Sequence, residues 1–346
     1  MTRVHRLALI GFGTVGQGFA EILLDKEDEL IERFGTAFQI VAISDLVKGN
    51  LYQPTGLDLA TLLNTVRRTG KLDSYPDSPT LRRDWDSITT IWNSNADTMI
   101  EVSWTDVQTG EPAISHVRAA FESGKNALLT NKGPVALAYR ELAELARDNQ
   151  VQFRFEGTVM SGTPAIRMAE TTLAGCEINQ IRGILNGTTN FILSQMEEGQ
   201  SYDAALAEAQ RLGYAEADPT ADVEGWDAAG KAVILANVLM NGKLTLSDVD
   251  RTGITEIDAR DIQAAQNASE RWKLIARVWQ EDGVTRASIK PTRVSLSHPL
   301  AGVGGASNAL TFTTDLLGDV TLVGPGAGKR ETGYAVLGDL LDIAGT

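Results

Sequence analysis

Short apolar runs alternate with helical patterns along the first 150 residues. The runs that indicate buried strands are Arg6–Ile10, Gln39–Ser44, Thr98–Ser103 and Asn126–Thr130. The periodic segments that indicate helices are Val15–Phe34, Ala113–Ser123 and Leu137–Asp148. Strands that alternate with helices are typical of βαβ units around a parallel sheet. Residues 46–90 are less regular, and we expect a segment there that departs from the alternation of strands and helices.

The pattern changes after residue 150. A strand is indicated at Val151–Glu156, followed by a loop of small residues, Gly157–Pro164. Further along we expect helices at Tyr202–Leu212 and Asp227–Met240, β segments at Ala287–Leu296 and Ala309–Val323, and a final helix at Tyr334–Ile343. The fold class predicted is therefore α/β, with a Rossmann-type doubly wound domain and a second, α+β domain.

Composition narrows the class of protein. A length of 346 residues suggests about two domains, and the net charge is −14. The single cysteine, Cys176, excludes an internal disulfide and a zinc site of the multi-cysteine kind. The acidic balance argues against a nucleic-acid or anionic-membrane partner, because both attract basic patches. No apolar run approaches the roughly 18 residues of a membrane span, so we expect a soluble cytoplasmic protein.

A glycine-rich loop joins the first strand to the first helix. It reads Gly11-Phe-Gly13-Thr-Val-Gly16. In the dinucleotide fingerprint the first glycine permits a tight turn, the second admits the pyrophosphate and the third allows helix-on-strand packing. The helix N-terminus then offers amide donors to the phosphates. The candidate cofactor-binding residues of this loop are Gly11, Gly13, Thr14, Val15 and Gly16.

The end of the second predicted strand leaves the choice of nucleotide open. Asp45 stands where an acid would accept a hydrogen bond from a ribose 2′-hydroxyl and favour NAD. Lys48, three residues on, is suited to a 2′-phosphate, and both residues also fit an ordinary solvated turn.

Two lysines are candidates for chemistry. Lys132 follows a predicted strand, at the edge where open α/β sheets bind ligands, although a surface lysine is an equal interpretation. Lys231 ends an acidic stretch that contains Glu216, Asp222 and Asp227. That stretch fits a solvated loop that caps a helix, with Asp227 and Lys231 as an i, i+4 pair. It also fits a proton-donating lysine beside carboxylates that bind a substrate ammonium group.

Other motifs carry less information. Gly183–Asn190 reads as a polar turn or helix cap, and Gly324–Gly328 as a turn before the final helix. The histidines at positions 5, 116 and 298 have no metal-ligand spacing, so we interpret each as structural. Nothing in the sequence around Cys176 would activate a thiolate.

Taken together, these motifs resemble the homoserine dehydrogenase family over nearly the whole chain. The segments that carry the resemblance are Gly11–Gly16, Thr130–Pro134, Glu156–Pro164, Gly183–Asn190, Gly213–Lys231, Gly324–Thr332 and Ala335–Asp339. The resemblance implies NAD(P)-dependent interconversion of L-homoserine and L-aspartate 4-semialdehyde, on the threonine and methionine branch of the aspartate pathway. It also implies a homodimer formed through the substrate domain. No segment resembling a regulatory domain follows, so feedback by threonine through such a domain is not expected.

The resemblance assigns roles to individual residues. Lys231 matches the catalytic acid/base lysine, and Lys132 its partner lysine, near both nicotinamide and substrate. Glu216 and Asp227 match substrate-binding carboxylates, and Asp222 lies in the same stretch. The further positions that match cofactor contacts are Ser103, Thr105 and Gly328. The implied domains are a nucleotide domain (1–150), a substrate and dimerisation domain (151–320) and a C-terminal segment (321–346) that returns to the nucleotide domain.

The loop after residue 155 resembles one that binds a monovalent cation, usually sodium, through backbone carbonyls. By position the ligands would be Glu156, Val159, Ser161 and Thr163. The family's usual small residues before the proline are replaced here by Ser161-Gly162-Thr163, and Trp104 stands where a small residue or proline is usual.

These departures keep two alternatives open. One is a related NAD(P)-dependent dehydrogenase of another small amino or hydroxy acid. The other is a non-catalytic cofactor-binding protein, which the presence of the acid/base residues disfavours.

Overall fold

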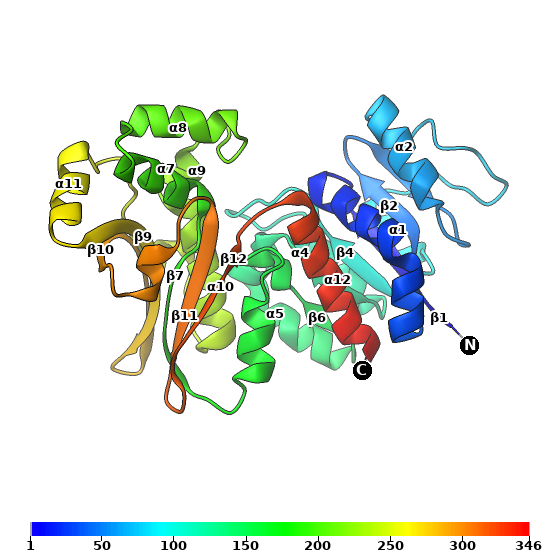
Figure 1. Ribbon diagram of the computed structural model, residues 1–346. Helices are drawn as coiled ribbons and strands as arrows, with labels where there is room; N and C mark the ends of the chain where they lie inside the picture. Colours follow the sequence, from blue (N-terminus) through cyan, green and yellow to red (C-terminus); the bar gives the residue numbers. More distant parts are fainter. Residues whose placement is uncertain (1, 346) are drawn as a thin grey trace. The chain divides into compact units, whose positions relative to one another are not determined.

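The computed structural model describes residues 2–345, which form two compact units. The first unit contains the chain up to Gly162 and again from Gly328, and the second is Thr163–Ala327. The chain therefore leaves the first unit once and returns to it for its last helix (Figure 1). In the part of the chain that is described, no helix combines the length and apolar character needed to cross a bilayer.

The first unit is built on a six-stranded sheet with the order β3-β2-β1-β4-β5-β6. Its strands are β1 (Arg3–Ile10), β2 (Thr36–Asp45), β3 (Gly49–Tyr52), β4 (Thr98–Glu101), β5 (Asn126–Leu129) and β6 (Phe153–Arg154). All neighbouring pairs are parallel except β2 and β3, which form an antiparallel hairpin. The strand order reverses between β1 and β4, and doubly wound sheets bind ligands at such a point.

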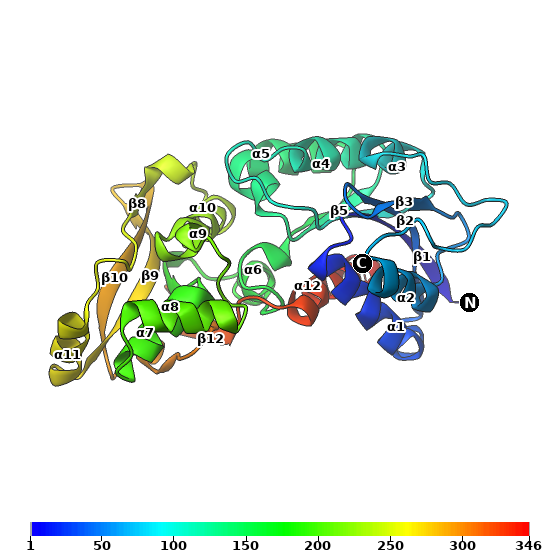
Figure 2. The same cartoon turned by 90° about the horizontal axis from the view of Figure 1, so that it is seen from above.

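Helices cover both faces of this sheet. They are α1 (Thr14–Phe34), α2 (Leu59–Thr69), α3 (Ser87–Asn93), α4 (Ala113–Glu122), α5 (Lys132–Asp148) and α12 (Lys329–Gly345), with a 3₁₀ turn, η1 (Glu156–Thr158). Figure 2 shows α1, α2 and α12 on one side and α3, α4 and α5 on the other. Burial on both sides explains why Leu7–Ile10 is a continuous apolar run instead of an alternating one.

The last helix packs closely against the first. A Cβ built on Gly18 of α1 would lie 2.3 Å from the Lys329 carbonyl oxygen, and one on Gly333 would lie 2.8 Å from the Phe19 nitrogen. Two glycines thus allow the two helix backbones to touch. Ion pairs from Lys329 to Glu21 (2.7 Å) and from Arg330 to Asp25 (2.8 Å) flank the contact.

The second unit contains a mostly antiparallel sheet with the order β12-β11-β7-β9-β10-β8. Its strands are β7 (Ile178–Ile184), β8 (Val249–Arg251), β9 (Glu270–Glu281), β10 (Val284–Ser295), β11 (Ser307–Thr314) and β12 (Gly318–Pro325). Only the short edge pair of β8 and β10 is parallel.

The helices of the second unit lie mainly along one side of its sheet (Figure 2). They are α6 (Ala165–Arg167), α7 (Gly187–Glu197), α8 (Tyr202–Arg211), α9 (Thr220–Val223), α10 (Trp226–Leu239) and α11 (Ala259–Asn267), with the short turns η2 (Met168–Thr172), η3 (Leu246–Asp248) and η4 (Pro299–Gly302). Helix α10 is apolar around most of its circumference because it is buried against β9 and β10.

The α/β fold class expected from the sequence is confirmed, and several element predictions need correction. The strand expected at 151–156 shrinks to Phe153–Arg154, because the chain turns into η1 at Glu156. The helix expected from Leu137 is preceded by a further helical segment that starts at Lys132, is capped by the Asn131 side chain and meets the rest at a kink at Ala138. The segment read as a polar turn or helix cap at 183–190 contains the end of β7, and its Asn186 is the cap of α7. The sequence patterns predicted no strand at β7, β8 or β9.

A buried lysine holds part of the second unit together. Lys273 of β9 is fully buried, and its Nζ donates to the Asn190 side-chain oxygen (3.0 Å) and to the Val303 carbonyl (2.8 Å). Burial lowers the pKa of this ammonium group to about 8, although the nearby Glu197 carboxylate opposes the shift. The second unit therefore contains an amino group that loses its proton more easily when folded than when unfolded.

We predict that Lys273→Met changes how stability depends on pH. Between pH 8 and 10.5 the unfolded lysine keeps a proton that the folded one has lost, so the wild type gains stability as pH rises. Relative to the variant, the gain across that window is about 3 kcal/mol. Urea unfolding at several pH values measures it. Lys290→Met, which removes an exposed lysine of β10, is the matched control and retains the wild-type slope. Equal slopes for wild type and Lys273→Met would contradict the prediction.

Candidate active site

The glycine loop has the geometry of a dinucleotide turn. Gly11 has a φ of 97°, and a Cβ there would lie 2.7 Å from both the Ser103 nitrogen and the Val102 carbonyl oxygen. A Cβ on Gly16 would lie 2.9 Å from the Gly11 oxygen, so the first and third glycines serve close packing. A Cβ on Gly13 would meet nothing within 4 Å. The second glycine therefore faces open space, as a phosphate cradle requires.

The first helix begins directly at this loop. Thr14, whose side chain is exposed, is its first residue, and the half-buried Val15 follows. No side chain hydrogen-bonds the helix N-terminus at the Gly13 N-cap. The amides of this first turn are thus available to a phosphate, whose charge the helix dipole also favours.

The Asp45 carboxylate is fixed by main-chain donors. It accepts from the amides of Phe12 (2.6 Å), Val47 (3.0 Å) and Lys48 (2.8 Å). These hydrogen bonds join the glycine loop to the β2–β3 turn and hold an acid at the carboxyl end of β2. Leu46 and Val47 at the tip of that turn are 103% and 73% exposed.

A second loop follows β4 and contains Ser103 and Thr105, both half-buried. The Asn131 side-chain nitrogen donates to the carbonyls of Ser103 (3.4 Å) and Trp104 (3.0 Å). The Asn131 oxygen accepts from the Gly133 amide (3.0 Å) and so caps α5. Asn131 thereby couples this loop to Lys132, the half-buried first residue of α5. Trp104 is 80% exposed.

The expected cation loop is almost entirely buried. Glu156, Val159 and Ser161 lie in the first unit and Thr163 begins the second. The Glu156 amide donates to Asp339 of α12 (3.0 Å), and the Ser161 and Thr332 hydroxyls are hydrogen-bonded at 2.8 Å. Ser161 has a φ of 52°, a conformation more usual for glycine.

Side chains do not supply an evident metal site. Within residues 2–345, no group of three or more His, Cys, Asp or Glu side chains is arranged to hold a metal ion. A cation bound in the expected loop would therefore use oxygens of another kind, such as backbone carbonyls, which hard cations accept.

A buried lysine, Lys231, lies beside half-buried carboxylates in the second unit. This residue of α10 is 7% exposed, and its Nζ donates to the Leu185 carbonyl (2.6 Å) and the Asp227 carboxylate (2.7 Å). Leu185 lies between β7 and α7, so the lysine is held between two parts of the unit. Its surroundings are small residues of α10, of which Ala228, Ala229 and Gly230 are buried.

Asn186 brings the carboxylates of this cluster together. Its side-chain nitrogen donates to Asp222 (2.6 Å) and Asp227 (3.0 Å), and its oxygen caps α7 by accepting from the Thr189 amide. Burial raises the pKa of Asp222, and the negative charge of Asp227 adds to the effect. The sequence pointed to the three charged residues but gave Asn186 only a turn or cap role. The signal for it was an asparagine directly after a strand.

Two further predicted site residues are exposed and lie outside helices and strands. Glu216 is exposed on the loop between α8 and α9. Gly328 is exposed directly before α12, with a φ of 140° and the Glu331 carboxylate where a Cβ would stand.

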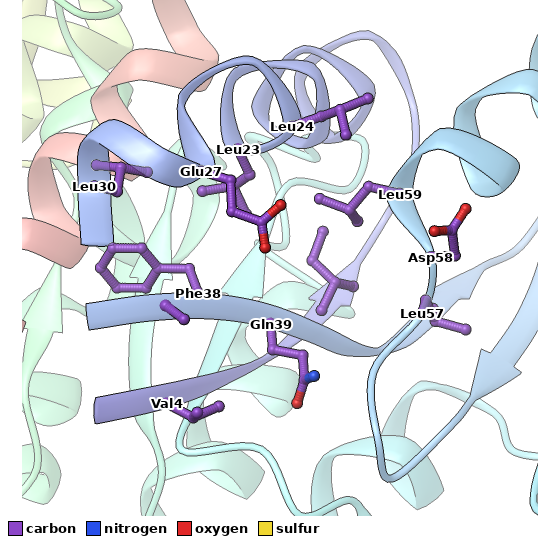
Figure 3. Close-up of a pocket in the computed structure, with 12 residues that line it drawn as sticks. Val4, Leu23, Leu24, Glu27, Leu30, Phe38, Gln39, Leu57, Asp58 and Leu59 are labelled. Atoms are coloured by element: carbon purple, nitrogen blue, oxygen red, sulfur yellow. The ribbon is translucent and has the colours of Figure 1, made fainter. Parts of the chain in front are cut away.

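One cavity, of about 210 Å³, lies elsewhere in the first unit (Figure 3). It is formed by α1, β2 and the segment that leads into α2. Its lining residues include none of the predicted site residues: they are Val4, Leu23, Leu24, Glu27, Leu30, Ala37, Phe38, Gln39, Ile40, Leu57, Asp58 and Leu59.

The fold and the candidate site residues together define the class of enzyme. A doubly wound sheet with an open glycine cradle and an acid after β2 fits a nicotinamide dinucleotide. The Lys231 cluster fits proton transfer to and from an alcohol. The protein is accordingly an NAD(P)-dependent oxidoreductase that acts on a CH–OH group.

Comparison with known proteins gives the family. The family model described as homoserine dehydrogenase matches residues 164–341. The NAD(+)-dependent homoserine dehydrogenase of Pseudomonas canavaninivorans is 44% identical over 98% of this chain and 96% of its own. The crystal structure of a putative homoserine dehydrogenase from Archaeoglobus fulgidus has a TM-score of 0.87 at 38% identity, covering 98% of this chain and 99% of that one. A hyperthermophilic archaeal homoserine dehydrogenase in complex with NADPH has a TM-score of 0.82 at 32% identity, covering 98% and 97%. The chain belongs to the homoserine dehydrogenase family.

The geometry of the glycine loop predicts different effects for two similar substitutions: one should lower stability, and the other should weaken nucleotide binding. Gly11→Ala places a Cβ against the backbone of the β4 loop and should destabilise the protein by about 3 kcal/mol. Gly13→Ala places its Cβ in open space, so folding is unchanged while the dissociation constant for NADH rises about tenfold or more. Thermal unfolding and fluorescence titration measure the two quantities. Unchanged NADH binding by Gly13→Ala would contradict the prediction that the space at Gly13 admits the pyrophosphate.

Proposed function

We propose that the protein interconverts L-homoserine and L-aspartate 4-semialdehyde with NAD(P), in the biosynthesis of threonine and methionine. The observation that carries this proposal is the ion pair of the buried Lys231 with the half-buried Asp227, in the second unit of a chain that belongs to the homoserine dehydrogenase family. The pair supplies a proton-transferring group in a class of protein that oxidises alcohols.

The glycine loop and its neighbours would hold the dinucleotide. Gly13 and the first turn of α1 (Thr14, Val15) offer space and amide donors for the pyrophosphate. The remaining contacts that we propose are Gly11, Gly16, Asp45, Ser103, Thr105, Lys132 and Gly328. When bound, the nicotinamide accepts or returns the hydride of the substrate's carbinol carbon.

Lys231 is the residue that we propose as general acid and base. During oxidation its amine takes the proton of the substrate hydroxyl at Nζ, and during reduction its ammonium returns a proton to the aldehyde oxygen. Hydrogen bonds to Asp227 and to the Leu185 carbonyl fix the direction in which Nζ points. Lys132 contributes positive charge that stabilises the developing alkoxide.

The carboxylates are proposed to recognise the amino acid. Glu216 and Asp227 would accept from the substrate's ammonium group, because a charge-assisted hydrogen bond selects an amino acid over an unsubstituted alcohol. Asp222 shares the Asn186 amide with Asp227 and helps to place it.

We predict that Lys231→Ala abolishes homoserine oxidation and leaves NADH binding unchanged, because it removes the proton acceptor but not the nucleotide cradle. The loss of kcat should be at least about 100-fold. Steady-state assay and NADH titration measure the two effects. Lys243→Ala, an exposed lysine of the same unit, is the control and keeps the wild-type rate. A near-normal rate for Lys231→Ala would remove the lysine from the mechanism.

A substrate panel tests the second candidate, a related dehydrogenase of another small amino or hydroxy acid. The observation that favours it is Trp104, a bulky and 80% exposed residue in the loop after β4. Activity on another alcohol without activity on homoserine would select it. NADH binding without turnover of any panel member would select a non-catalytic protein.

A monovalent cation, sodium by preference, is proposed at the backbone oxygens of Glu156, Val159, Ser161 and Thr163. The support is the burial of this loop together with its resemblance to the family's cation loop. The homoserine assay distinguishes the cases when it is run in sodium and in choline salts of equal ionic strength. A rate that is the same in both would remove the cation from the proposal.

We propose that NAD is preferred over NADP. The fixed Asp45 carboxylate can accept from a ribose hydroxyl and would repel a 2′-phosphate. The exposed side chains at the tip of the turn, Leu46 and Val47, carry no charge that would attract such a phosphate, and Lys48, which could, is half-buried. The name of the Pseudomonas relative specifies NAD(+), whereas the archaeal structure contains NADPH, so the family as a whole does not decide the choice.

We predict that Leu46→Arg shifts this preference. A guanidinium group at the tip of the β2–β3 turn can pair with the 2′-phosphate, which should raise kcat/KM for NADP relative to NAD about tenfold. Leu46→Gln, which adds a polar group without charge, is the control and leaves the ratio unchanged. A wild-type enzyme that already prefers NADP would contradict the assignment.

Assembly and location are also proposals. We propose a homodimer formed through the second unit and a cytoplasmic location, both on the resemblance to the family and the sequence composition.

A further inference from the structure

Glu101 is a buried acid for which the proposed chemistry has no use. It is the last residue of β4, a central strand of the first unit, and its side chain is 0% exposed. A carboxylate loses much hydration energy on burial and remains charged only where donors replace the water. Its hydrogen-bond partners therefore indicate what it does.

Both carboxylate oxygens of Glu101 are hydrogen-bonded. One accepts from the Ser103 amide at 2.9 Å, and the other lies 2.7 Å from Nδ1 of His116 on α4. A carboxylate can only accept, so Nδ1 of His116 donates. His116 is itself 5% exposed, and its position is set by the helix that covers this face of the sheet. The three residues form a chain from α4 to the backbone of the loop after β4.

The Ser103 backbone packs directly against the glycine loop at Gly11. A Cβ on Gly11 would lie 2.7 Å from the Ser103 nitrogen and 2.8 Å from its Cα, so the two backbones are in direct contact. The amide that contacts Gly11 is also the one that donates to Glu101. A shift of Ser103 would therefore move the turn that presents Gly13 to a phosphate.

We propose that Glu101, oriented by His116, is a positioning residue for the dinucleotide site. It holds the Ser103 backbone at the place where Gly11 packs and so keeps the glycine loop in its binding geometry before the nucleotide arrives. This inference rests on the proposed function, because it assumes that the loop binds NAD(P). A charged acceptor suits the task, since hydrogen bonds to a carboxylate are stronger and more directional than those to a neutral group.

The same strand provides a matched control. At the opposite end of β4, Thr98 is hydrogen-bonded to another buried histidine, His5, at 2.7 Å, and both residues are at most 3% exposed. Thr98 and Glu101 are three positions apart in the strand, which is about 10 Å. Loss of the Thr98 hydroxyl should cost stability in the same way without touching the glycine loop.

The experiment compares Glu101→Ala, Glu101→Gln and Thr98→Val with the wild type. We expect Glu101→Ala to raise the dissociation constant for NADH and the KM for the nucleotide about tenfold, with the KM for homoserine unchanged. Glu101→Gln should bind within about threefold of the wild type, because its amide can accept from Ser103 and donate to a neutral Nδ1 of His116. Thr98→Val should lower the melting temperature and leave NADH binding unchanged. If Glu101→Ala does not fold, His116→Asn supplies the test, since its side chain reaches Glu101 less well and should weaken NADH binding about threefold.

The outcomes separate this inference from the proposed function. Wild-type NADH binding by Glu101→Ala, or a loss for Thr98→Val as large as that for Glu101→Ala, would overturn the positioning role. A wild-type protein that neither binds NADH nor oxidises homoserine would instead overturn the proposed function.

Discussion

A charged side chain that leaves water has to recover its hydrogen bonds, and in this protein the main chain supplies many of them. Asp45 is held by three backbone amides, Glu101 by the amide of Ser103, and Lys231 by a carbonyl that precedes α7. A side chain adds a further hydrogen bond at two of them: His116 at Glu101 and Asp227 at Lys231. Each of these groups is tied to its neighbouring backbone, because it cannot move without breaking the hydrogen bonds that satisfy it.

The same constraint explains why two asparagines are so important here. Asn131 and Asn186 both follow a strand and cap the next helix. The amide nitrogen of Asn131 donates to the loop after β4, and that of Asn186 donates to Asp222 and Asp227. An amide has donors and an acceptor on one planar group, so one residue can end a strand, start a helix and hold a loop or a carboxylate. An aspartate would cap as well but could not donate, and in the Lys231 cluster it would add a third negative charge.

Much of the first unit could be predicted from the sequence, because its strands are buried on both faces and stand out as short apolar runs. The glycine loop was recognisable for a similar reason: the backbone contact at Gly11 leaves no room for another residue. The second unit was harder. Strand β9 contains Lys273 and Arg277 among its apolar residues, and these charges interrupt the alternating pattern that marks a half-buried strand. The charged members of the Lys231 cluster were evident as an acidic stretch, whereas Asn186, Glu101 and His116 were not, since their roles arise from partners distant in the chain.

The contact between α1 and α12 has a consequence for how the protein is made. Helix α12 buries Ala335, Val336, Leu337, Leu340 and Ile343, and several of these pack in the same core as Leu7 and Phe19. That core combines residues of β1 and α1 with residues of α12, which are translated only after the whole second unit. During synthesis the apolar surface of β1 and α1 that packs against α12 therefore stays uncovered until the second unit has been translated and α12 has been released. A chain that stops shortly before residue 329 would have every residue of the glycine loop and still lack the helix that backs it.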